Sequence, residues 1–65
     1  MKKGRFLKAA RIEAGYDQSE VAEKLGVARE MVSRYENGKS EPPLDKLIIL
    51  SNLYNKTIDY LVRGE

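Results

Sequence analysis

Apolar side chains recur three or four positions apart in five stretches of this chain, and glycine, proline or asparagine separates the stretches. Such spacing is typical of amphipathic helices. The predicted helices cover about Arg5 to Ala14, two short segments within Gln18 to Gly38, about Leu44 to Tyr54, and Ile58 to Val62. In the first helix, Phe6 or Leu7, Ala10 and Ala14 are expected to face inward, and Thr57 can cap the last helix. Residues 1–4, a short basic lead with Lys2 and Lys3, and residues 63–65 are expected to lie outside the helices. The pattern therefore predicts an all-α fold with five helices.

The segment from Gln18 to Gly38 predicts two short helices joined by a turn. At about 100° per residue, apolar residues gather on one side of each helix. These residues are Val21, Ala22 and Leu25 in the first helix, and Met31, Val32 and Tyr35 in the second. Gly26 stands between the helices, and glycine accepts the positive φ that a sharp turn requires. Asp17 and Glu20 have the spacing of a capping box, which sets the start of the first helix.

The opposite side of the second short helix carries only hydrogen-bonding side chains. Arginine can bond guanine through two hydrogen bonds, glutamate can accept from cytosine, and serine can pair with several base edges. A single helix also fits the major groove of DNA. The candidate base-reading residues are Arg29, Glu30, Ser33 and Arg34.

Composition limits the other possibilities. Sixty-five residues make one small domain, residues 1–65, without cysteine or histidine. Disulfides and thiolate or imidazole metal sites are therefore excluded, and we expect no metal and no cofactor. The absence of an obvious base, nucleophile or carboxylate pair makes an enzyme the weakest hypothesis.

Basic charge is concentrated at the N-terminus. The net charge is only +2, but five of the 12 basic side chains, and no acidic one, fall within the first 11 residues. Arg5, Lys8 and Arg11 are candidate phosphate contacts, with a plain solvated helix face as the alternative. No stretch has the roughly 20 apolar residues of a membrane span, nor the apolar run of a signal peptide. A cytoplasmic protein without a membrane partner is expected.

The segment from Gln18 to Lys39 resembles the helix-turn-helix of the phage repressor and Cro family, also called the xenobiotic response element type. Counted from Gln18, the matching positions are Val21, Ala22, Leu25, Gly26, Val27, Val32 and Tyr35, followed by Glu36-Asn37-Gly38-Lys39. The resemblance covers about Phe6 to Val62 and implies a five-helix, lambda-repressor-like DNA-binding domain. Its helix-turn-helix motif is residues 18–37.

The resemblance also implies roles for individual residues. It implies DNA-backbone contacts from Gln18, Asn37, Lys39 and Ser40. It implies an ion pair between Arg11 and Glu36 that holds the first helix to the recognition helix. The chain departs from the family at Ala28, where a serine or threonine usually caps the recognition helix.

The fourth predicted helix is apolar on more than one side. Its expected inward residues are Leu44, Leu47, Ile48, Leu50, Ser51 and Tyr54. Ile49 and Leu53 lie four positions apart on the other side, where the family more often has polar residues. An exposed apolar pair of this kind suggests a homodimer contact. Packing beneath the last helix is the alternative.

The leading functional hypothesis is a sequence-specific regulator, more specifically a repressor, that binds double-stranded DNA as a dimer. The alternative is a protein-binding module, such as an antitoxin or antirepressor partner on the same fold. Glu30 on the presumed DNA side and the low net charge favour that alternative. A core this small is not expected to hold a small-molecule effector.

Overall fold

The computed structural model describes residues 4–65, and local sequence signals account for where its helices begin and end. The helices are α1 (Gly4–Ala14), α2 (Gln18–Leu25), α3 (Arg29–Glu36), α4 (Leu44–Tyr54) and α5 (Ile58–Arg63). The predicted all-α fold with five helices is confirmed. The last helix extends one residue further than predicted, and Gly64 ends it in the left-handed conformation.

Capping follows the predicted chemistry. The Asp17 carboxylate accepts a hydrogen bond from the Glu20 amide at 2.8 Å, and the Glu20 carboxylate accepts one from the Asp17 amide at 2.8 Å. Gly26 turns the chain after α2 with φ 72°. The Thr57 hydroxyl caps α5 by accepting from the Tyr60 amide. Ala28 leaves α3 without a side-chain cap, as its sequence predicts.

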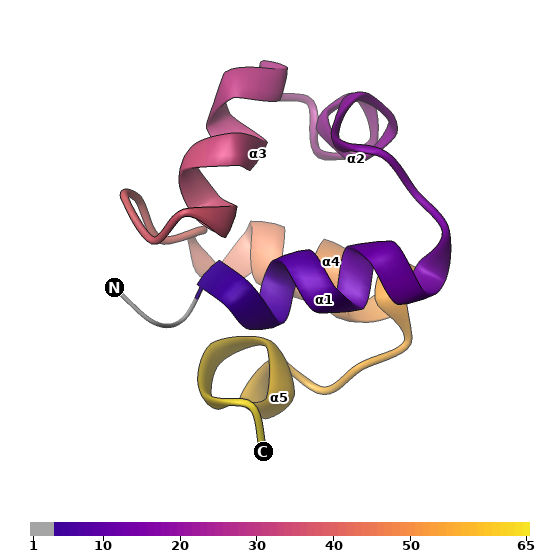
Figure 1. Ribbon diagram of the computed structural model, residues 1–65, viewed down its shortest axis with the longest axis vertical. Helices are drawn as coiled ribbons and strands as arrows, with labels where there is room; N and C mark the ends of the chain where they lie inside the picture. The colour runs from indigo at the N-terminus through magenta and orange to yellow at the C-terminus, as the bar shows by residue number, and fades with distance from the viewer. Residues whose placement is uncertain (1–3) are drawn as a thin grey trace.

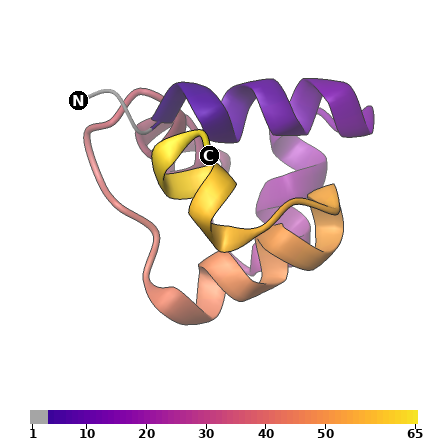
Figure 2. The same cartoon turned by 90° about the horizontal axis from the view of Figure 1, so that it is seen from below.

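Helix α1 runs across the middle of the molecule, with α2 and α3 on one side and α5 on the other (Figure 1). Seen from below, α5 lies between α1 and α4 (Figure 2). Helix α2 is viewed nearly end-on in Figure 1 whereas α3 lies in the plane of the view, so the two cross steeply. This crossing turns one long side of α3 away from the rest of the protein.

All five helices contribute to the hydrophobic core. Its buried apolar residues are Leu7, Ala10, Val21, Ala22, Leu25, Val32, Tyr35, Leu50, Tyr54 and Leu61. Tyr16, Val27, Met31, Leu53 and Tyr60 pack against it. The inward residues predicted for the helix-turn-helix are therefore confirmed, with Met31 only partly buried.

Three expectations about the core are wrong. Ala14, expected inward, is exposed at the end of α1. Leu44 and Ile48, expected inward on α4, are 64% and 47% exposed. Because α4 carries apolar residues almost all round, helical spacing did not determine which side is buried. The buried side is centred on Leu50 and Tyr54 and extends toward Leu53.

Gly4 begins α1 and is buried, although the sequence suggested only a short lead there. A Cβ atom at this position would lie 2.4 Å from the backbone oxygen of Glu36. Glycine therefore lets the first turn of α1 lie directly against the last turn of α3. The expected basic lead at Lys2 and Lys3 falls outside the described residues.

Candidate nucleic-acid interface

Helix α3 presents a polar side to solvent because its apolar side is held in the core. Val32 and Tyr35 are 2% and 7% exposed. On the opposite side, the predicted base-reading residues Arg29, Glu30 and Arg34 are exposed and Ser33 is partly exposed. The outward direction of this strip, which we call the α3 strip (Arg29, Glu30, Ser33 and Arg34), is thus the arrangement that base contact requires.

A buried ion pair joins α1 to the end of α3. Arg11 Nε lies 2.7 Å from Glu36 Oε2, and Arg11 Nη2 lies 3.2 Å from Glu36 Oε1. The side chains are only 12% and 3% exposed. Arg11 Nη1 also donates to the Tyr16 carbonyl at 2.9 Å, which ties the chain after α1 to the same pair. The predicted Arg11–Glu36 contact is therefore present, and its position supports a structural role.

The environment of this pair shifts the pKa values of Arg11 and Tyr54. The hydrogen bond to Glu36 raises the pKa of the Arg11 guanidinium above its already high usual value, so the group stays charged. Burial, followed by the negative charge of Glu36, raises the pKa of the Tyr54 phenol. Tyr54 is therefore neutral at ordinary pH.

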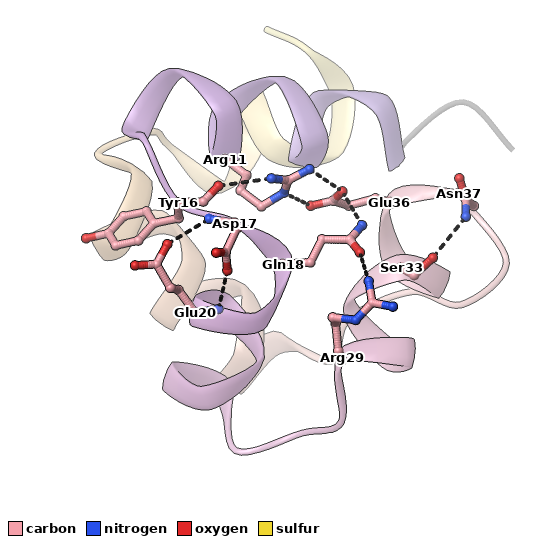
Figure 3. A network of polar contacts seen from close by, with 9 residues as sticks. All are labelled: Arg11, Tyr16, Asp17, Gln18, Glu20, Arg29, Ser33, Glu36 and Asn37. Atoms are coloured by element: carbon pink, nitrogen blue, oxygen red, sulfur yellow. Dashed lines mark hydrogen bonds and ion pairs between the residues drawn. The ribbon is translucent and has the colours of Figure 1, made fainter.

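Gln18 connects this buried pair to the α3 strip (Figure 3). Its amide nitrogen Nε2 donates to Glu36 Oε1 at 3.0 Å, and its oxygen Oε1 accepts from Arg29 Nη1 at 3.0 Å. Helix α2 places Gln18 in its first turn, directly after the N-cap residue Asp17. The predicted backbone-contact residue and one predicted base-reading residue thus form one hydrogen-bonded unit.

The other end of the α3 strip contacts the loop that follows. Arg34 Nε donates to the Ser40 hydroxyl at 3.0 Å, and Asn37 Nδ2 donates to the Ser33 hydroxyl at 3.3 Å. Lys39 is exposed in the same loop. The structure therefore brings the predicted loop residues next to the predicted base-reading residues.

The two remaining basic candidates on α1 take different positions. Lys8 is exposed and follows Gly4 by four positions on the helix face that packs against α3. The Arg5 guanidinium lies 5.3 Å from the centroid of the Phe6 ring, and Phe6 stacks edge-on with Tyr60 of α5. Arg5 is thus directed toward the α5 side and is not brought to the α3 strip.

Sequence analysis missed a contact that supports the motif from behind. Lys46 Nζ of α4 donates to the Leu25 carbonyl at 2.9 Å, at the end of α2 where helix carbonyls lack partners. The two residues are 21 positions apart. The local sequence carries no signal for it, because Lys46 follows Asp45 in the first turn of α4, where a solvent-exposed lysine is equally expected.

The structure also bears on the predicted apolar pair of α4. Ile49 is 37% exposed, whereas Leu53 is partly buried and packs against the core. Within residues 4–65, no three histidine, cysteine, aspartate or glutamate side chains are grouped to hold a metal ion.

None of the helices in the described part of the chain has the length and apolar character needed to cross a membrane.

Comparison with known proteins shows relatives along nearly the whole chain. A family model described as helix-turn-helix matches residues 7–61. The HTH-type transcriptional regulator ImmR of Bacillus subtilis is 48% identical over 62 residues, which cover 95% of this chain and 49% of ImmR. The prophage-derived regulator YonR of the same organism is 41% identical over 61 residues, covering 94% of this chain and 56% of YonR. The chain therefore spans about half the length of these relatives.

The fold is also similar to that of a solved repressor structure. The crystal structure of the P22 c2 repressor in complex with a synthetic operator aligns with a TM-score of 0.89 and 26% identity. The alignment covers 100% of this chain and 98% of the repressor chain. The predicted lambda-repressor-like fold is confirmed by this match.

Proposed function

Because this chain belongs to the Cro/C1-type helix-turn-helix family of transcriptional regulators, we propose that it binds double-stranded DNA in a sequence-specific way and represses transcription. The observation that carries the proposal is the α3 strip, which the buried Val32 and Tyr35 hold outward. The similarity to a repressor crystallised with its operator supports the same function.

Base selection is assigned to the α3 strip. Arg29 and Arg34 suit guanine, Glu30 suits cytosine, and Ser33 can serve several base edges. Contacts to the DNA backbone are assigned to residues on either side of the strip, which would position it in the groove without reading sequence. These are Gln18, through its second amide hydrogen, Asn37, Lys39, Ser40 and Lys8, with Arg5 as a more distant charge.

We further propose that two copies bind an inverted repeat. Two recognition helices related by a dyad read half-sites about 34 Å apart, one turn of DNA. A symmetric dimer uses the same patch on both subunits. Three of the four large apolar side chains exposed within residues 4–65 belong to α4: Leu44, Ile48 and Ile49. We place the dimer contact at this α4 patch, which keeps Ile49 from the sequence prediction and assigns Leu53 mainly to the core.

Two substitutions test the division between base and backbone contacts. Arg34→Ala should cost about 1 to 3 kcal/mol and relax the preference at one base pair. Lys39→Ala should weaken binding to all duplexes alike and flatten the salt dependence by about one charge. Fluorescence anisotropy with cognate and random duplexes at several salt concentrations measures both effects. Equal losses on cognate and random DNA for both variants would contradict the assignment.

A protein-binding module remains the second candidate because Glu30 places an exposed carboxylate within the α3 strip. Arg29 and Arg34 are moreover hydrogen-bonded within the protein. Binding to random duplex at low salt separates the two functions, since a DNA-binding member of the family should bind there more tightly than the dissociation constant of about 1 to 100 μM typical of non-specific binding at physiological salt. No binding under those conditions would favour the protein-binding function.

A further inference from the structure

The turn after α3 contains an asparagine followed by a glycine, Asn37-Gly38. In such a pair the backbone nitrogen of the glycine can attack Cγ of the asparagine side chain and close a succinimide ring. Glycine favours this attack because it has no Cβ beside the nitrogen. The other two asparagines, Asn52 and Asn55, precede a leucine and a lysine, whose side chains hinder it. The sequence therefore marks Asn37 as the most reactive asparagine of the chain.

The folded chain leaves this pair accessible and weakly held. Asn37 is exposed and lies just past the end of α3 with ψ 2°. Ring closure requires rotation about this ψ, which breaks the hydrogen bond from the Gly38 amide to the Tyr35 carbonyl. That bond is 3.3 Å long, beyond the usual range of about 2.7 to 3.2 Å. The bond from Asn37 Nδ2 to the Ser33 hydroxyl is also 3.3 Å long (Figure 3). Both reacting groups are thus restrained by long hydrogen bonds.

The covalent step consumes only water. The Gly38 amide gives its proton to hydroxide, its nitrogen bonds to Cγ of Asn37, and the Cγ–Nδ2 bond breaks. The departing nitrogen takes up a proton from water and leaves as ammonia, which restores the hydroxide. A water molecule then opens the ring at one of its two carbonyls and leaves aspartate or isoaspartate. The net change is one amide replaced by one carboxylate, without oxidation or reduction.

This replacement falls within the proposed DNA interface. The Asn37 amide contacts Ser33 of the α3 strip, and the exposed Lys39 follows two positions later. An amide can donate a hydrogen bond to a phosphate, whereas an ionised carboxylate only accepts. The new negative charge also repels the phosphate. The product is therefore expected to bind every duplex more weakly, whatever its sequence.

We propose that Asn37-Gly38 is a site of spontaneous deamidation that limits how long the free protein keeps its affinity for DNA. A bound duplex slows the reaction, because the phosphate that accepts from the Asn37 amide covers it and repels the hydroxide that starts the attack. The consequence for DNA binding rests on the proposed function, whereas the covalent step does not.

The first test follows the covalent step in the full chain, incubated at mildly alkaline pH with and without random duplex at low salt. Trypsin cleaves after lysine and arginine, so it separates Asn37, in peptide 35–39, from Asn52 and Asn55, in peptide 47–56. Mass spectrometry should detect the amide-to-acid exchange first in peptide 35–39, and later when duplex is bound. Exchange no faster at Asn37 than at the other asparagines, or equally fast with duplex bound, would overturn the proposal.

The second test measures the consequence for DNA. Incubated wild-type protein and fresh Asn37→Asp should bind random duplex at low salt about tenfold or more weakly than fresh wild type, since one donor is lost and one negative charge is gained. Asn37→Gln keeps the amide but must close a larger ring, so it should lose no affinity during the same incubation. Circular dichroism verifies that each sample is folded.

Two contrary results have different meanings. If folded Asn37→Asp binds duplex as tightly as wild type, or if Asn37→Gln loses affinity as fast as wild type, deamidation at this site does not control DNA binding and the inference fails. If fresh wild-type protein binds no duplex, the proposed function itself fails, and the peptide masses without duplex still decide whether the covalent step occurs.

Discussion

Glu36 contacts both a residue that stabilises the fold, Arg11, and a residue of the proposed DNA interface, Gln18. Its carboxylate is nearly inaccessible to solvent, and it bonds Arg11 of α1 and Gln18 of α2 while its own backbone oxygen packs against Gly4. A buried charge of this kind is tolerated only with a well-placed partner. Helical spacing places Glu36 at the border of the buried side of α3, where a carboxylate needs a partner. Only the family resemblance indicated that the partner is Arg11.

Removing the Arg11 guanidinium should therefore destabilise the folded protein. Arg11→Met leaves the Glu36 carboxylate buried without its compensating charge, and we expect the free energy of unfolding to fall by about 3 to 5 kcal/mol. Urea denaturation at neutral pH measures the change. Arg63→Met is the matched control, since its pair with Asp59 is exposed and should be worth less than about 1 kcal/mol. A loss from Arg11→Met no larger than that of the control would show that the pair is not structural.

At the scale of elements, the sequence was most informative where one local signal had one interpretation. The Asp17–Glu20 capping box, Gly26 and Thr57 each specified a helix boundary, and each is found as expected. For helix α4, in contrast, the sequence did not identify the buried side. Apolar residues on almost every side of it left its rotation to contacts with other helices, so Leu44 and Ile48 were assigned wrongly.

The uncapped start of α3 gives a direct test at this scale. Ala28 has the extended backbone of an N-cap, φ −72° and ψ 152°, but no side-chain acceptor. Ala28→Ser should supply one and stabilise the protein by about 0.5 to 2 kcal/mol. Thermal and urea unfolding measure the gain, and Ala28→Val serves as the control without an acceptor. No difference between the serine and valine variants would mean that this position does not limit the stability of α3.

For the molecule as a whole, contacts distant in sequence were the hardest to predict. Neither the Lys46–Leu25 bond nor the close approach of Gly4 to α3 has a local signature, because each depends on how whole helices pack. Arg5 is a related case, because Phe6, beside which its guanidinium lies, stacks with Tyr60 of α5. The predicted contact of Arg5 to the DNA backbone stays a prediction. The outward direction of the α3 strip, in contrast, followed from helical spacing alone.

The proposed homodimer through the α4 patch can also be tested. Leu44→Lys should weaken self-association by about tenfold or more without loss of stability, because Leu44 is exposed in the single chain and belongs to the proposed α4 patch. Sedimentation equilibrium over a range of protein concentrations measures the dissociation constant. Ile12→Lys makes the same change at an exposed apolar residue of α1 and should have no effect. Equal effects from the two variants, or none from Leu44→Lys, would remove α4 from the interface.

The role of the α3 strip is tested most directly by selecting duplexes from a random pool with the wild-type protein and with Arg34→Ala. The wild type should enrich an inverted repeat whose half-sites are centred about one DNA turn apart. Arg34→Ala should enrich the same repeat with the preference lost at one base pair in each half. Enrichment of no sequence, or of a sequence whose preferences are unchanged by the substitution, would contradict recognition through α3.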